Sequence, residues 1–220
     1  MMQVLVRRAA GFALVAALMA GCSKVPGVYV YEKDGQAAAA KAGGGADPKA
    51  YVAENWAAKI VPTVHAKAVD VTTVAAAIAK DPAAAGKQYG HQSGTGSPFA
   101  YLVKGEGTVT DMDTSAPTGP MTVEIDQKGG KPLKVSIATG PVIAGTAIRD
   151  AVGFISFGDF TNQIDYAEAA NQINAKVKTD VIAKVDLASL KGKKVEFYGA
   201  FSALAPGTIF LVPTELTVAP

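Results

Sequence analysis

The chain has 220 residues, a length that fits one ordinary domain or one domain with a terminal appendage. Hydrophobic residues make up 49% and charged residues 18%, which supplies enough apolar surface for a packed core and excludes wholesale disorder. The single cysteine excludes an intrachain disulfide and a thiolate-based zinc site, and the formal charge of +2 argues against a dedicated nucleic-acid binder.

Residues 1–21 have the organisation of a secretory signal peptide. Arg7 and Arg8 form a positive segment, and residues 11–20 form an uncharged run that is too short to span a bilayer comfortably. Removing residues 1–21 takes away two of the 21 basic side chains and none of the 19 acidic ones, so the mature chain has equal numbers of each. No electrostatic argument for a nucleic-acid partner therefore remains.

A lone cysteine directly follows the apolar run. The sequence from Leu18 to Cys22 (LMAGC) resembles the lipobox of bacterial lipoproteins. By that resemblance, the chain is cleaved between Gly21 and Cys22, and Cys22 carries diacylglycerol and an N-acyl chain such as palmitate, with no other cofactor expected. Because more than one acyl chain holds a protein stably on a membrane, the membrane is an expected partner. Ser23 stands where an Asp usually signals retention in the inner membrane, and it slightly favours the outer membrane. The alternative for Cys22 is an unmodified, buried thiol.

Residues 22–46 are expected to form a lipidated, flexible tether. The run GQAAAAKAGGGA at 35–46 contains small residues, has low complexity and lacks aromatic side chains, which is typical of a spacer. This segment would connect the lipid to the folded part of the chain.

Residues 47–90 predict a small helical unit packed on the next domain. Asp47 and Asp81 are each followed by a proline, which pairs a helix N-cap with a favourable first helical residue. Apolar residues recur three or four positions apart between these two starts, as in amphipathic helices. Pro62 is expected to break or restart the first helix, because proline has no backbone N–H.

The period of the apolar residues changes to two after the helical unit, which predicts half-buried strands. Gly105 and Gly107 interrupt the first strand and predict a bulge or sharp bend there. A long helix is expected over about 159–185, with Asp159 or Thr161 as its N-cap. The predicted strands cover residues 99–111, 121–125, 133–137, 195–201 and 208–218.

The predicted order is three strands, one helix and two strands. That order is typical of the OB-fold, a five-stranded Greek-key barrel with its helix between strands three and four. The expected fold class is therefore α+β, with an OB-like β-β-β-α-β-β barrel over residues 91–220. A plain β-sandwich with one helix is the alternative.

Residues 139–170 join the third strand to the long helix and contain the most specific sequence of the chain. The runs GPVIAGTAIRD at 140–150 and FGDFTNQIDYA at 157–167 resemble an uncharacterised family of predicted periplasmic lipoproteins. The resemblance covers essentially the whole mature domain. Because members of that family are often encoded beside sugar ABC-transporter genes, it implies an envelope location and a possible sugar or transporter partner. It implies no activity and no catalytic residue.

Polar and aromatic residues of this segment are the candidate ligand- or partner-binding residues. Amide side chains can pair with sugar hydroxyls, and aromatic rings can stack on a sugar face. The structural alternative is that Asp159 caps the helix, that Arg149 pairs with a nearby Asp, and that the phenylalanines fill the core. This alternative is favoured because motif inferences from one sequence have many false positives. The candidates are Arg149, Asp150, Phe157, Asp159, Phe160, Asn162, Gln163 and Tyr166.

No catalytic or metal-binding pattern stands out in the sequence. His65 and His91 are far apart and have no spare cysteine beside them, so a transition-metal site is not expected. The chain has no Gly-x-Ser-x-Gly nucleophile motif. Asp111 and Asp113 have the spacing that begins a calcium loop, but the required glycine and closing Glu do not follow.

These observations favour a lipid-anchored, non-enzymatic envelope protein. It would bind a small ligand, such as a sugar, or serve transport as an accessory module. The alternative is an interaction or scaffold lipoprotein that docks on a transporter component or another envelope protein. A hydrolase is a third and less favoured hypothesis.

Overall fold

The computed structural model describes residues 45–127, 129–204 and 207–219. The predicted signal peptide, the predicted lipidation site Cys22 and all but the end of the predicted tether lie outside the described residues. The described residues belong to one compact unit. Within the described ranges, every helix is too short or too polar to cross a membrane.

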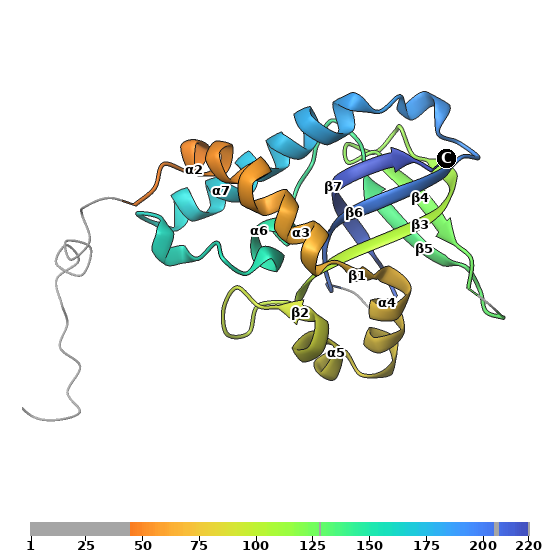
Figure 1. Cartoon of the computed structure of the whole chain (residues 1–220), viewed down its shortest axis with the longest axis horizontal. Helices are drawn as coiled ribbons and strands as arrows, with labels where there is room; N and C mark the ends of the chain where they lie inside the picture. The colour runs from red at the N-terminus through yellow and green to blue at the C-terminus, as the bar shows by residue number, and fades with distance from the viewer. Residues whose placement is uncertain (1–44, 128, 205–206, 220) are drawn as a thin grey trace, which may run out of the picture. The chain divides into compact units, whose positions relative to one another are not determined.

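Five strands pair in a closed ring, called the strand ring below (Figure 1). β3 pairs antiparallel with both β4 and β6, β4 with β5, and β6 with β7, whereas β5 and β7 are parallel. The predicted strands and their order along the chain are confirmed, with ends that differ by at most two residues. The strands are β3 (Ala100–Met112), β4 (Pro120–Ile125), β5 (Leu133–Ala138), β6 (Lys194–Ser202) and β7 (Phe210–Val218).

β3 is long enough to pair with two neighbours in succession. Residues 100–108 pair with β6, and residues 108–112 pair with β4. The register against β4 shifts between Val109 and Asp111, so the irregularity falls after the two glycines rather than at them. By passing from one partner to the next, β3 joins the two ends of the strand ring.

The two glycines of β3 are explained by close packing. A Cβ atom on Gly105 would lie 2.7 Å from the Phe197 ring, and one on Gly107 would lie 2.5 Å from the Glu124 carbonyl oxygen. Contacts that short require the neighbouring atoms to move, so these positions need a residue without a side chain.

The predicted helical unit is present and contains more elements than expected. Asp47, Asp70 and Asp81 cap its helices by accepting backbone N–H bonds of 2.8–3.0 Å through their carboxylates. Two short strands, β1 (Val69–Asp70) and β2 (Gly90–His91), pair with β3 and attach the unit to the strand ring. The helices are α2 (Pro48–Asn55), η2 (Trp56–Ile60), α3 (Val61–Lys67), α4 (Val71–Lys80) and α5 (Pro82–Tyr89).

Pro62 restarts the helix rather than breaking it, because it is the second residue of α3, which follows η2 without interruption. η2 is a π-helical turn just before the proline, and the Val61 N–H bonds to the Trp56 carbonyl, five residues back. A widened turn accommodates a proline in a continuous helix, since local π geometry rearranges the carbonyls that would otherwise meet its ring.

The segment between β5 and β6 differs from the expected single helix over about 159–185. A short helix, α6 (Ala147–Val152), precedes it, and the main helix begins at Gln163 rather than near Asp159. The main helix lies beside α2 (Figure 1). The elements after α6 are η3 (Phe157–Asp159), α7 (Gln163–Lys176), η4 (Val177–Val181), η5 (Ile182–Lys184) and η6 (Leu187–Ser189).

A single core joins the strand ring to the helices. Val103 and Phe197 are fully buried on neighbouring strands of the ring. Trp56 and Ile60 belong to the same cluster from the helical unit, with 5% and 0% of their surface exposed. The helical unit is therefore part of the domain's packed core.

Candidate functional site

Arg149 is the most buried charged residue among the candidates and is fully occupied by internal contacts. Its Nε and Nη2 atoms donate to one carboxylate oxygen of Asp150 at 2.9 and 2.8 Å, and Nη1 donates to the Tyr166 carbonyl at 3.0 Å. The guanidinium carbon lies 3.8 Å from the centre of the Tyr166 ring, a cation–π contact. Only 9% of the Arg149 side chain and 12% of the Asp150 side chain are exposed.

The second carboxylate oxygen of Asp150 is also occupied. It accepts a 2.6 Å hydrogen bond from the Thr146 hydroxyl. The Asp150 carbonyl accepts from His91 Nδ1 at 2.7 Å, which ties β2 to α6. Burial raises the pKa of the Tyr166 hydroxyl above its ordinary value, an effect that the Arg149 charge opposes. We call Arg149, Asp150, Tyr166 and Thr146 the Arg149 cluster.

The other polar candidates shape the backbone at the start of α7. Asn162 is the N-cap of α7, and its side-chain oxygen accepts the Asp165 N–H at 2.9 Å. Asp159 is instead the last residue of the short η3 turn, where its carboxylate closes a capping box by accepting the N–H of Ser156, the N-cap of η3, at 2.7 Å. The expected cap at Asp159 or Thr161 is therefore wrong, because Asp159 is used one turn earlier. Gln163 is exposed on the first turn of α7.

The aromatic candidates divide between core and surface. Phe160 is 5% exposed, and its ring contacts those of Tyr51 and Tyr166 with centroids 5.2 and 5.9 Å apart. Phe157 is 51% exposed and lies edge-on to the Tyr166 ring at 6.0 Å. The structure thus brings the predicted residues together at the junction of α6, η3 and α7, where Arg149, Asp150 and Phe160 are used in internal contacts, Asp159 and Asn162 cap local turns, and Phe157 and Gln163 are exposed.

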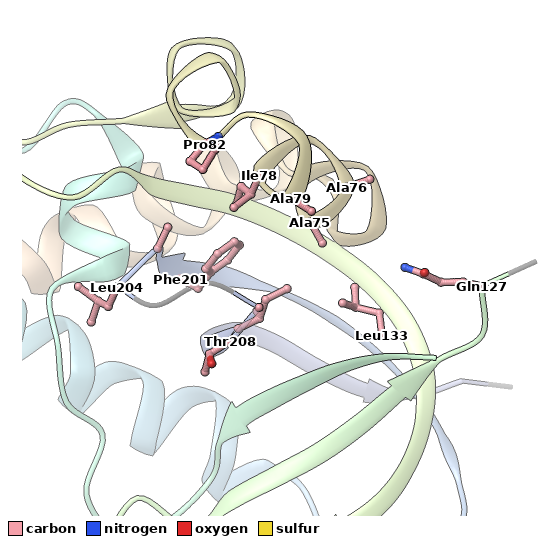
Figure 2. Close-up of a pocket in the computed structure, with 13 residues that line it drawn as sticks. Ala75, Ala76, Ile78, Ala79, Pro82, Gln127, Leu133, Phe201, Leu204 and Thr208 are labelled. Carbon is pink, nitrogen blue, oxygen red and sulfur yellow. The ribbon is translucent and has the colours of Figure 1, made fainter. Parts of the chain in front are cut away.

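A pocket of about 500 Å³ lies elsewhere, between α4 and the segment that joins β6 to β7 (Figure 2). We call it the α4 pocket. No candidate residue from the sequence lines it. On the helical side it is lined by Ala75, Ala76, Ile78, Ala79 and Pro82. On the strand side it is lined by Gln127, Leu133, Phe201, Ala203, Leu204, Gly207, Thr208 and Ile209.

The side chains that line the α4 pocket are mainly apolar. Gln127 and Thr208 supply its polar side chains, and no charged residue contributes to the lining. Phe201 and Ile209 anchor the lining in the core, with 1% and 6% of their surface exposed, whereas Leu204 is 79% exposed. The volume lies within the roughly 300–1,000 Å³ that is typical of small-molecule sites.

Sequence reasoning missed this pocket because its signal is weak. Alanines at 75, 76 and 79 suit any helix, and nothing in the sequence says that α4 crosses the β6–β7 connection. The signal that remained was a run of small residues on the pocket side of a helix, beside the bulky Ile78. Small side chains leave volume where larger ones would fill it.

The two histidines lie apart and serve local contacts. His65 Nε2 lies 2.9 Å from a Glu215 carboxylate oxygen, and its ring stacks on Tyr198 with centroids 4.2 Å apart. In the part of the chain that the structure describes, no three His, Cys, Asp or Glu side chains are close enough together to hold a metal ion.

The strand pairings and the helix between the third and fourth strands of the ring define an OB-like fold. A solved OB-fold protein from Thermotoga maritima has the same fold, with a TM-score of 0.65 and 21% sequence identity over 80% of this chain and 100% of that one. No curated protein matches the chain.

A family model described as "Predicted periplasmic lipoprotein (DUF2291)" matches residues 12–217. The chain belongs to this family of predicted periplasmic lipoproteins. The match confirms the family resemblance carried by residues 140–150 and 157–167, and it agrees with an envelope location. The proximity to sugar-transporter genes stays a prediction.

Proposed function

We propose that this chain is a lipid-anchored, non-enzymatic envelope protein that binds a small, mainly apolar ligand in the α4 pocket. Cys22 is the proposed lipid attachment site, and the strand ring is proposed to be the predicted five-stranded barrel that carries the pocket. The observation that carries the proposal is the pocket itself, with its volume of about 500 Å³ and its apolar lining.

The position of the pocket in the fold supports a binding role. In OB-folds, the connection between the fourth and fifth strands is one of the loops that contact ligands. The corresponding connection here runs from β6 to β7 and contributes Ala203, Leu204, Gly207 and Thr208 to the lining. The fold alone does not identify a ligand, so the chemical class of the ligand follows from the residues that line the pocket.

The lining supports an apolar ligand better than a sugar. A buried sugar needs a partner for most of its hydroxyl groups, because an unpaired buried hydroxyl costs roughly 1–3 kcal/mol. Gln127 and Thr208 are the polar side chains of the lining, and the amides of Asn162 and Gln163 are outside it. The proposed ligand is therefore an uncharged, mainly apolar compound rather than a sugar.

The test is to identify the small molecules that co-purify with the full chain. Wild type, Ala79→Trp and Ala84→Trp would be extracted from membranes in polymer-bounded lipid discs, and the small molecules that denaturation releases in excess of those in protein-free discs would be identified by mass spectrometry. Ala79 lines the pocket, so the indole ring is expected to fill it and exclude the ligand. Ala84 is an exposed alanine of α5 outside the lining, so its variant is the matched control.

We expect one class of compound to accompany wild type and Ala84→Trp and to be depleted from Ala79→Trp. Equal recovery from all three variants, or recovery of nothing from wild type, would contradict the proposed function. Unfolding curves of the three variants separate loss of ligand from loss of fold.

A further inference from the structure

We propose that the α4 pocket takes one aliphatic chain of an envelope amphiphile, such as a fatty acid or a phospholipid. This inference rests on the proposed function and names its ligand class. It follows from the residues that line the pocket and from the pocket's expected distance from the membrane.

The lining offers a hydrocarbon chain continuous apolar contact. Ala75 and Ala79 of α4 form part of one wall, and Phe201 and Ile209 lie on the strand side. The alanines place methyl groups along the wall and no side-chain atom beyond Cβ, which leaves room for an occupant beside the helix. An alkyl chain carries no polar group that the lining would leave unpaired.

The two polar side chains of the lining, Gln127 and Thr208, lie apart in Figure 2. In the view of Figure 2, Gln127 and Leu133 lie on one side of the lining, Leu204 lies on the opposite side, and the α4 residues lie above them. The Gln127 amide offers both a donor and an acceptor, so it suits the polar head of an amphiphile. The lining has no charged residue to bind an ionised ligand in the interior, so a charged headgroup is expected to stay outside.

The predicted anchor would keep the pocket close to a source of aliphatic chains. If Cys22 is lipidated, the tether of residues 22–46 can separate it from the folded unit by at most roughly 85 Å, the fully extended length of that segment. The domain would therefore remain at the membrane surface, where fatty acids and phospholipids are abundant. The mature chain's balanced charge provides no competing attraction for a polyanion.

Photo-crosslinking in intact cells tests this inference on the full chain. Bacteria that express it would be grown with a palmitic acid analogue that carries a diazirine and a terminal alkyne, then irradiated. Labelled protein would be captured through the alkyne and digested, and the modified residues would be mapped by mass spectrometry. The mass of each adduct distinguishes a free fatty acid, a phospholipid and an acyl group attached to the Cys22 peptide.

We expect adducts on peptides that contain α4 or residues 203–209. In Ala79→Trp their yield should fall roughly tenfold, the effect of excluding about two methylene groups from an apolar site, whereas Ala84→Trp should keep the wild-type yield. Leu204→Asp is a second variant, in case the bulky indole disturbs the fold. It places a charge beside the pocket at a side chain that is 79% exposed, and it should also lower the yield.

Two results would overturn the inference. One is labelling that avoids the pocket peptides in wild type, and the other is labelling of those peptides that Ala79→Trp and Leu204→Asp leave unchanged. If a compact, non-aliphatic compound co-purifies with wild type and is lost from Ala79→Trp, this inference is wrong while the proposed function stands.

Discussion

The α4 pocket and the Arg149 cluster are opposites in composition and in packing. The Arg149 cluster concentrates charge, hydroxyl groups and an aromatic ring, and the side chains of Arg149, Asp150 and Thr146 are paired with one another or with the nearby backbone. The α4 pocket contains alanines, aliphatic side chains and two polar groups, and it encloses about 500 Å³ of space. The polar and charged Arg149 cluster is therefore packed without a pocket, whereas the mainly apolar residues around α4 line one.

In this protein, the polar side chains that resemble a binding site and the pocket that could hold a ligand lie in different places. Arg149 and Asp150 come from α6 and Tyr166 from α7, and Arg149 joins the two helices through its 3.0 Å hydrogen bond to the Tyr166 carbonyl and its 3.8 Å contact with the Tyr166 ring. Buried polar groups must be hydrogen-bonded, so these groups pair with one another and are not available to bind a ligand. Small residues on a helix leave volume between the helix and a neighbouring element, and a ligand can occupy that volume.

The largest expected effect is on the Arg149 cluster. Arg149→Ala should lower the free energy of unfolding by about 3–5 kcal/mol, because it leaves the Asp150 carboxylate buried without its counter-charge. Denaturant unfolding of the full chain, followed by circular dichroism, measures the change. Lys134→Ala is the control, since Lys134 pairs with Glu124 at 3.1 Å but is 70% exposed, and it should cost less than about 1 kcal/mol.

This result would also test the division between the two regions. If Arg149→Ala changes the free energy of unfolding no more than the Lys134→Ala control and instead removes a bound molecule, the Arg149 cluster is a binding site. The assignment of the cluster to the packed core would then be wrong.

A smaller effect is expected at the start of α7. Asn162→Ala removes the side chain that accepts the Asp165 N–H, and the loss of a helix N-cap typically costs about 1 kcal/mol. Gln163→Ala, at the next and exposed position, should change stability by less than about 0.5 kcal/mol. Equal costs for the two variants would contradict the assignment of Asn162 as the cap.

The sequence predicted the strands well because their signal is local. Met121, Val123 and Ile125 alternate with more exposed residues along β4, and this period of two appears directly in the chain. The closure of the ring depends on β3 pairing with β6, across about 90 residues, and it was inferred only from the order of elements. The lipoprotein features at Gly21 and Cys22 lie outside the described residues and stay a prediction.

The sequence could not resolve the helix start or the pocket. Asp159 and Asn162 are both good N-cap residues three positions apart, and only the folded chain shows that Asp159 closes the capping box of η3 whereas Asn162 caps α7. The pocket depends on where α4 crosses the β6–β7 connection, which is a property of tertiary packing. Single-sequence patterns carry no information about the distance between such elements.

The smallest effect is expected only at alkaline pH and concerns the Tyr166 ring over Arg149. Burial raises the pKa of the folded Tyr166 hydroxyl above its ordinary value of 10.0, so above that pH the unfolded chain releases a proton that the folded chain keeps. Stability should therefore fall as the pH rises from about 10 through the raised pKa of the folded state. Tyr166→Phe should make this decline shallower without abolishing it, because burial also raises the pKa of Tyr101 and Tyr51.

Phe157→Leu is the control, because it changes the packing on the Tyr166 ring but removes no titrating group. Denaturant unfolding across this pH range should give it the wild-type dependence of stability on pH. A wild-type slope in Tyr166→Phe would mean that the Tyr166 hydroxyl is as hydrated as in the unfolded chain, and the junction would then be open enough to admit a ligand.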